Sequence, residues 1–161
     1  MINKNTKFFI SVSRFHGSTG SLLHNTGYKI KNLNCIYFPL KCENISEFKS
    51  LINNKNFKGI SVSMPFKSKA LRFLNIIDNS VKKTQSVNTI VRKKNFLSGY
   101  NTDYLALKKI IRDKNIRIKN SLILGNGSTA RTSYELLKEL KIKKLYLCSR
   151  NKKNYNKWKI R

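Results

Sequence analysis

One glycine-rich segment of this chain has the residue types and spacing that bind phosphate groups. Residues Gly125–Ala130 read GNGSTA, a G-x-G-x-x-A pattern that follows the apolar run Leu122–Leu124. Glycines allow a tight turn and close backbone approach to a ligand, and the free N–H groups of the following helix bind a pyrophosphate. The alternative is a strand-to-helix turn without a ligand. The pattern predicts a dinucleotide site using Gly125, Gly127, Ser128, Thr129 and Ala130.

The residues after the next predicted strand indicate which dinucleotide the turn would bind. NAD sites place an acidic residue there for the ribose hydroxyl groups, whereas this chain has Ser149, Arg150 and Asn151. A carboxylate would repel a 2′-phosphate, but the planar guanidinium of Arg150 can donate several hydrogen bonds to it. The segment therefore predicts NADP(H) as the cofactor. A solvated basic loop is the alternative.

Lys67 and Asp103 are candidates for acid–base chemistry. Lys67 follows Pro65 at the end of a predicted strand, where parallel sheets place functional groups. Asp103, one of seven acidic residues, stands at the start of a predicted helix. Each has a plainer interpretation, as a surface lysine and as a helix-start residue. His16 and His24 have no companion ligands, so we predict no metal site and expect His24 to be packed and hydrogen-bonded.

Short apolar runs alternate with amphipathic stretches along the chain. The apolar runs predict strands at 7–12, 34–40, 59–64, 121–125 and 144–148, and a hairpin at 86–97. Helical spacing predicts helices at 22–30, 45–52, 67–74, 79–84, 101–111 (capped at its start) and 128–140. This order predicts βαβ units in an α/β fold with a mainly parallel sheet. The polar stretch 112–120 predicts a domain boundary.

The composition is that of a basic globular protein. The chain has 34 Lys and Arg against 7 Asp and Glu, a net charge of +27, with 40% hydrophobic residues. The basic residues are spread from Lys4 to Lys159 instead of forming one block. This spread favours a solvated basic surface over a nucleic-acid footprint, which stays open as the alternative.

Cysteine spacing and hydropathy predict the compartment. Cys35, Cys42 and Cys148 have no C-x-x-C spacing, so we expect reduced thiols and a cytoplasmic location. No run of ~18 apolar residues predicts a membrane span. The polar start Met1–Lys7 lacks the hydrophobic core of a signal peptide.

Six motifs, in matching order and spacing over nearly the whole chain, resemble those of the shikimate dehydrogenase family. A collinear set is far more specific than any one motif. The motifs are Gly20–Asn25 (GSLLHN) at the S-P-x-x-H-N position, Gly59–Lys67 (GISVSMPFK) like G-x-N-V-T-x-P-x-K, Ser86–Ile90 (SVNTI) like A-V-N-T-I, Gly99–Asp103 (GYNTD) like G-x-N-T-D, Leu124–Arg131 (LGNGSTAR) like L-G-x-G-G-x-x-R, and Ser149–Asn151 (SRN) where the family has N-R-T.

The resemblance implies a fold and an activity. It implies an N-terminal substrate-binding domain with a mainly parallel sheet at 1–100, and the first βαβ of a Rossmann-type NADP-binding domain at 101–161. The implied reaction is the reversible NADPH-dependent reduction of 3-dehydroshikimate to shikimate, in chorismate and aromatic amino-acid biosynthesis. Small molecules, and neither nucleic acid nor a membrane, are then the expected partners.

The resemblance also implies roles for single residues. Lys67 would be the catalytic acid–base and Asp103 its partner, because the alkoxide formed by hydride transfer must be protonated. Asn88 and Asp103 would hydrogen-bond the ring hydroxyls of the substrate. Ser63, in place of the family's threonine, would do the same.

The chain departs from the family where the substrate carboxylate is bound. Ser18 and Ser21 are the candidates for that role, but the family's S-x-S-P reads STGS at 18–21, so one hydroxyl is lost or shifted. Ser61 replaces the family's asparagine, and Ser63 its threonine. These changes resemble a divergent shikimate-dehydrogenase-like branch, and they leave quinate or another cyclic hydroxy acid open as the substrate.

Family members are longer than this chain, which ends soon after the second strand of the cofactor domain. We therefore expect a truncated or partial chain with little activity of its own. The rival interpretations are a non-catalytic remnant that binds a shikimate-like or quinate-like acid, and a basic nucleic-acid-binding module.

Overall fold

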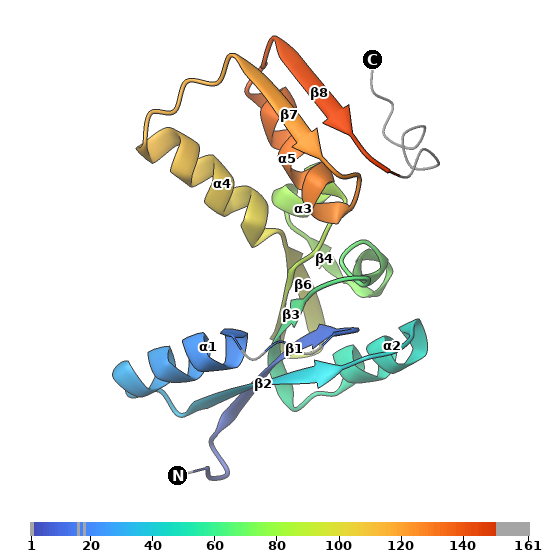
Figure 1. Cartoon of the computed structure of the whole chain (residues 1–161). Helices are drawn as coiled ribbons and strands as arrows, with labels where there is room; N and C mark the ends of the chain where they lie inside the picture. Colours follow the sequence, from blue (N-terminus) through green and yellow to red (C-terminus); the bar gives the residue numbers. More distant parts are fainter. Residues whose placement is uncertain (1, 16, 18, 151–161) are drawn as a thin grey trace. The chain divides into compact units, whose positions relative to one another are not determined.

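Strands and helices alternate through most of the chain (Figure 1). The computed structural model describes residues 2–15, 17 and 19–150. Two compact units form, one of residues up to Asp78 with Val87–Tyr100, the other of Asn79–Ser86 with residues from Asn101 onward. The elements are β1 (Lys7–Ser13), α1 (Thr19–Ile30), β2 (Cys35–Lys41), α2 (Ile45–Asn53), β3 (Phe57–Val62), the 3-10 helix η1 (Lys69–Phe73), β4 (Ile76–Ile77), α3 (Asn79–Thr84), β5 (Thr89–Lys93), β6 (Phe96–Tyr100), α4 (Thr102–Asp113), β7 (Asn120–Leu124), α5 (Ser128–Glu139) and β8 (Lys144–Cys148).

The first unit is built on a six-stranded sheet with strand order β2-β1-β3-β5-β6-β4. β1 pairs in parallel with β2 and β3, and β4 pairs in parallel with β6. β5 runs antiparallel to β3 and also to β6, with which it forms a hairpin whose turn includes Lys94 at φ 53°. The predicted α/β class and mainly parallel sheet are confirmed, with β5 as the strand that pairs antiparallel to both of its neighbours.

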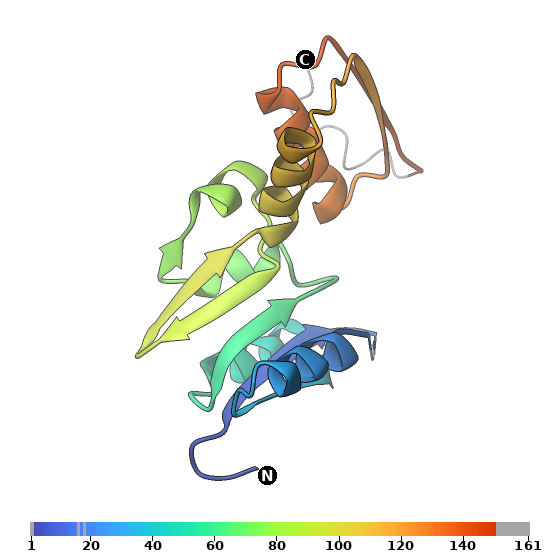
Figure 2. The ribbon, with the colours of Figure 1, turned by 90° about the vertical axis from the view of Figure 1, so that its left-hand side faces the viewer.

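Helices α1 and α2 cover opposite faces of the β2-β1-β3 part of this sheet (Figures 1 and 2). Right-handed crossovers require this, since α1 leads from β1 to β2 and α2 leads back past β1 to β3. The N-cap of α2 is Asn44, whose side chain accepts 3.0 Å hydrogen bonds from the N–H groups of Ser46 and Glu47. Phe48 and Ile52, four residues apart, are fully buried. This packing fixes the strands whose ends carry the candidate site.

The second unit contains the parallel β7–α5–β8 arrangement that the resemblance predicts. β7 and β8 pair from Asn120 opposite Lys144 to Leu124 opposite Cys148. Helix α5 packs on β7 and contacts both α3 and α4. Within the described part of the chain, every helix falls short of the length and apolar character that a bilayer-spanning helix needs.

Three details differ from the expectations. The segment predicted as a helix at 67–74 is a shorter 3-10 helix, and the two-residue strand β4 was not predicted. The polar stretch 112–120 is not a boundary between the compact units, because α4 before it packs on α5 after it within the second unit. Polarity there reflects solvent exposure rather than a change of domain.

Candidate functional site

The loop that follows β3 forms the first part of the candidate site. The N–H of Val62 donates a 2.7 Å hydrogen bond to the carbonyl of Asn88, and the N–H of Ser63 donates one of 2.9 Å to the carbonyl of Val12. These bonds place Ser63 at the carboxyl end of β3, between the end of β1 and the segment before β5. The side chain of Ser63 is exposed there.

Lys67 is held beside this strand end through its backbone. Its carbonyl oxygen accepts a 2.8 Å hydrogen bond from the N–H of Val87. Phe66 anchors the turn that leads to it, since Phe66 is 1% exposed and stacks on Phe48 with ring centroids 5.0 Å apart. The side chain of Lys67 is half-buried. These anchoring contacts use backbone atoms and a neighbouring ring, so they do not depend on the ammonium group.

Asn88 is fixed from both sides. Its N–H donates a 3.1 Å hydrogen bond to the carbonyl of Tyr100, and its Oδ1 accepts one of 3.0 Å from the hydroxyl of Thr89. Its own carbonyl accepts the bond from β3. The structure therefore brings Ser63, Lys67 and Asn88 together at the carboxyl end of β3.

The start of α1 carries the altered serine pattern. The hydroxyl of Ser21 is buried and has no hydrogen-bond partner among the described residues. A buried polar atom without a partner is rare in native proteins and points to a ligand or a water. At Gly20 a Cβ would lie 3.4 Å from the ring of Tyr37, so this ring stands beside the position where the family has its second serine. Ser18 lies outside the described residues.

Of the two histidines, His24 is the one that the structure describes. The ring of His24 packs on that of Tyr37, with centroids 4.3 Å apart, but the residue is exposed, so it packs at the surface and not in the core. Helix α1 buries none of its described residues, which is why a position next to Leu22 and Leu23 is not in the core. His16 lies outside the described residues. In the part of the chain that the structure describes, no three His, Cys, Asp or Glu side chains could share a metal ion.

Asp103 lies in the second unit, half-buried in the first turn of α4. The predicted cap is confirmed: Asn101 is the N-cap, and its Oδ1 accepts a 3.0 Å hydrogen bond from the N–H of Tyr104. The cap fixes the backbone of the turn that carries Asp103. Lys67 belongs to the first unit, and Asp103 to the second.

Asn101 is also the centre of a buried polar cluster that sequence reasoning missed. Its Nδ2 donates hydrogen bonds of 2.8 Å to the hydroxyl of Thr84 and 3.0 Å to that of Thr132, and its N–H donates one of 3.0 Å to Ser80 Oγ. A signal was available at Thr132, which stands four residues before the buried Leu136 on one face of α5. A hydroxyl on a buried helix face needs a partner.

The glycine turn after β7 has the backbone conformation that the pattern predicts. Gly125 has φ 107°, which L-residues rarely adopt, and its N–H donates a 2.7 Å hydrogen bond to the carbonyl of Cys148. Gly127 is the N-cap of α5 at φ −81°. A Cβ at either glycine would meet nothing within 4 Å, so a ligand has room against this backbone. Ser128, Thr129 and Ala130 form the first turn of α5.

A pocket of 450 Å³ opens at this turn. Its lining consists of Leu124, Gly125, Asn126, Cys148, Ser149 and Arg150. The structure thus brings the glycine turn together with Ser149 and Arg150, two of the residues predicted to hold a 2′-phosphate. No carboxylate stands among these lining residues, and Arg150 is exposed. Asn151 lies outside the described residues.

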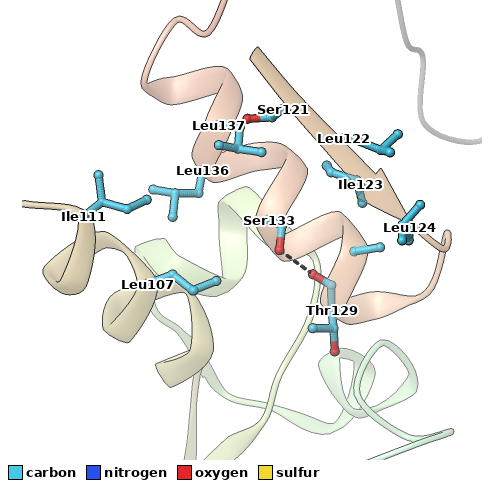
Figure 3. A pocket seen from close by; sticks show the side chains of 11 residues that line it. Leu107, Ile111, Ser121, Leu122, Ile123, Leu124, Thr129, Ser133, Leu136 and Leu137 are labelled. Carbon is cyan, nitrogen blue, oxygen red and sulfur yellow. Dashed lines mark hydrogen bonds between the residues drawn. The ribbon is translucent and has the colours of Figure 1, made fainter. Parts of the chain in front are cut away.

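A second pocket, of 460 Å³, lies beside β7 and is largely apolar (Figure 3). Helix α4 contributes Leu107 and Ile111, and the remaining walls come from β7 and α5. Leu122 and Leu124 of β7 are 62% and 75% exposed. No charged side chain lines this pocket, so its walls offer a phosphate group no ionic partner.

An ionic cluster ties together the helices around α4. The carboxylate of Glu139 lies 2.5 Å from the ammonium groups of both Lys83 and Lys108 and accepts a hydrogen bond from the hydroxyl of Tyr104. Hydrogen bonds from Lys108, Lys83 and Tyr104 lower the pKa of Glu139 from its ordinary value to about 2. The cluster connects α3, α4 and α5 within the second unit.

Comparison with known proteins gives one family. A family model described as the shikimate dehydrogenase substrate binding domain matches residues 13–90. The chain is 38% identical over 133 residues to the shikimate dehydrogenase (NADP(+)) of Clostridium botulinum strain Hall, covering 80% of this chain and 52% of that protein. It is 35% identical over 155 residues to a shikimate dehydrogenase-like protein of Haemophilus influenzae, covering 95% and 57% of the two chains.

A solved structure of a shikimate 5-dehydrogenase-like protein superposes with a TM-score of 0.85 at 33% identity, covering 98% of this chain and 59% of the other. The chain therefore spans about half the length of the curated relatives it matches. The match extends through both compact units, so it includes the glycine turn as well as the strand ends. The chain belongs to the shikimate dehydrogenase family.

Proposed function

We propose that this protein takes part in the NADP-dependent interconversion of 3-dehydroshikimate and shikimate. The observation that carries the proposal is the gathering of Ser63, Lys67 and Asn88 at the carboxyl end of β3, where α/β proteins bind their ligands. We take the substrate from the relatives, since the similar Clostridium botulinum protein is a shikimate dehydrogenase (NADP(+)).

The chemistry divides between the cofactor and two side chains. NADPH, when bound, supplies a hydride to the keto carbon of 3-dehydroshikimate. The ammonium of Lys67 would donate a proton to the carbonyl oxygen as that oxygen becomes an alkoxide, so the oxygen stays on the ring carbon as a hydroxyl group. In the reverse direction the neutral amine of Lys67 takes the proton back. Asp103 is the proposed acidic partner in this step.

Hydroxyl and amide groups would hold the substrate in place. Ser63 and Asn88 hydrogen-bond the ring hydroxyls, together with Asp103. The buried hydroxyl of Ser21 gains a partner when the substrate carboxylate binds, and Ser18 is its proposed companion. Because Gly20 stands where the family has a serine, the groups that would bind the substrate carboxylate differ here from those of the family. Quinate is therefore the acid to compare with shikimate.

The glycine turn fits NADP. The open backbone at Gly125 and Gly127 gives a pyrophosphate access to the first turn of α5, including Ser128, Thr129 and Ala130. Ser149, Arg150 and Asn151 are proposed to bind the 2′-phosphate. The absence of a carboxylate among the residues that line this pocket favours NADP over NAD.

Substrate binding and cofactor binding are assigned to successive parts of the sequence. Residues 1–100 act as the substrate-binding domain and 101–161 as the start of the NADP-binding domain. Both partners are small molecules rather than nucleic acid or membrane, and the place of action is the cytoplasm, where the three cysteines stay reduced.

The test is shikimate-dependent reduction of NADP⁺ by the purified protein, followed by the absorbance of NADPH. We expect low but measurable turnover in the wild type and in Lys69→Met, whose side chain is exposed two residues away, and none in Lys67→Met. Turnover that survives in Lys67→Met would contradict the role of Lys67. Shikimate binding without turnover in the wild type would refute the dehydrogenase proposal and identify a non-catalytic binding protein.

A further inference from the structure

The polar groups of Asn101 are all hydrogen-bonded, although the residue is only 1% exposed. Its backbone N–H bonds Ser80 Oγ, and its carbonyl accepts from the N–H of Leu105 at 3.3 Å. Its Oδ1 caps α4, and the two hydrogens of its Nδ2 bond the hydroxyls of Thr84 and Thr132. One side chain thus joins the start of α4 to α3 and α5.

Among the common helix caps, only an amide side chain can accept the cap hydrogen bond and donate the two others. The hydroxyl of Thr84 donates its hydrogen to the carbonyl of Ser80 at 2.7 Å, and that of Thr132 donates to the carbonyl of Ser128 at 3.0 Å. Both oxygens can therefore only accept from residue 101. Serine and aspartate are equally common helix caps, but neither supplies a cap acceptor together with two donors. The cluster thus explains why Asn101 is an asparagine.

The cluster also lies where the chain enters the second unit. The chain passes between the units after Asp78, after Ser86 and after Tyr100. Thr84 bonds Asn101 two residues before the second passage, and Asn101 itself directly follows the third. On the first unit's side, the N–H of Asn88 bonds the carbonyl of Tyr100. The residue next to Asn101 is therefore the one that holds Asn88.

We propose that Asn101 is a positioning residue for Asp103. By bonding Thr84 and Thr132, it fixes the first turn of α4 and with it the carboxylate two residues further along. The inference rests on the proposed function, in which Asp103 acts with Lys67 on the substrate. Asn101 itself touches neither substrate nor cofactor in this scheme.

Thr132→Val tests the proposal without altering the cap. Valine keeps the shape but removes the acceptor, so one hydrogen of the Asn101 amide is left unpaired in a buried place. Ser133→Ala is the matched control, because Ser133 also donates to a carbonyl four residues back, that of Thr129 at 3.3 Å, but does not reach Asn101. Thr132→Ser restores a hydroxyl and should restore the wild-type behaviour.

The readout is the carboxyl resonance of Asp103 in protein labelled with [4-¹³C]aspartate. The chain contains three aspartates, Asp78, Asp103 and Asp113, so the spectrum is simple to assign by substitution. We expect Thr132→Val to shift the Asp103 signal and leave Asp113 unchanged, with Ser133→Ala and Thr132→Ser like the wild type. An Asp103 signal that is the same in Thr132→Val and Ser133→Ala would overturn the proposal.

Shikimate titration of the same variants connects the position of Asp103 to binding. We expect Thr132→Val to bind about tenfold more weakly than Ser133→Ala. Equal affinity in these two variants would overturn the positioning role. If the wild type binds no shikimate, the proposed function fails, while the resonance comparison still decides whether Asn101 positions Asp103.

Discussion

The carbonyl oxygen of Lys67 accepts a 2.8 Å hydrogen bond from the backbone N–H of Val87, the residue before Asn88. Two proposed site residues from distant parts of the sequence are thereby held on neighbouring backbone segments. The bond uses no side-chain atoms, so the side chains of Lys67 and Asn88 can be changed without breaking it. Substitutions of these two side chains therefore test their roles while keeping the backbone hydrogen bond that holds the two segments together.

Ser21→Ala should affect stability and binding in opposite directions. Removing a buried hydroxyl that lacks a partner should raise the free energy of unfolding by about 1 kcal/mol. Shikimate binding should weaken, because the substrate carboxylate loses a donor. Urea denaturation and calorimetric titration measure the two effects. Binding as tight as in the wild type would exclude Ser21 from the carboxylate site.

The two glycines of the phosphate turn should respond differently to alanine. Gly125→Ala should cost roughly 1–2 kcal/mol of stability, because φ 107° is unfavourable for an L-residue. Gly127→Ala, at φ −81°, should leave stability nearly unchanged. Both should weaken NADP⁺ binding, since each new methyl group enters the space against which the phosphates pack. If Gly127→Ala binds NADP⁺ normally, the pyrophosphate does not lie there.

Arg150→Gln should reduce the preference for NADP⁺ over NAD⁺. A charge-assisted hydrogen bond contributes about 1.5–3 kcal/mol, so the affinity ratio should fall by tenfold or more. Lys143→Gln, at an exposed position, removes the same charge and serves as the control. The measurement is fluorescence titration with both dinucleotides. An equal loss of affinity in the two variants would indicate non-specific attraction to a basic surface.

Glu139→Gln should destabilise the protein in a pH-dependent way. The pKa of Glu139 is lowered in the folded state to about 2 by hydrogen bonds from Lys108 and Lys83. A lowered pKa stabilises the fold above the unfolded value of 4.5, and this contribution is lost as pH falls toward 2. Because both lysines are 49% exposed, we expect a difference of only about 1 kcal/mol at pH 7. Urea denaturation at pH 7 and pH 2.5 should show that difference shrinking. A difference independent of pH would contradict the assignment.

Much of the fold could be predicted from the sequence, because its strands and helices carry strong local signals. The strand 144–148 was predicted at its observed bounds, and a helix cap was predicted within 101–103 from residue types alone, where the structure has Asn101 as the N-cap. The strand β4 was missed because two residues give no periodicity. The boundary at 112–120 was misplaced because exposure and a change of domain both produce polar sequence.

The residues of the candidate site were also predicted only in part from the sequence. Lys67, Asn88 and Asp103 were singled out by motifs, and those motifs lie in continuous segments of the sequence. The cluster around Asn101 was missed because Thr84 and Thr132 lie 17 and 31 residues from it, and their pairing arises only when three helices pack. The buried hydroxyl of Ser21 likewise depends on how α1 packs, which composition does not reveal.

The most direct test of the account is calorimetric titration of the purified protein with shikimate. We predict one binding site in the wild type, retained in Lys69→Met, and affinity at least tenfold weaker in Lys67→Met, with both variants unfolding like the wild type. Absence of binding in the wild type, or equal binding in the two lysine variants, would contradict the claim that the carboxyl end of β3 is a shikimate site.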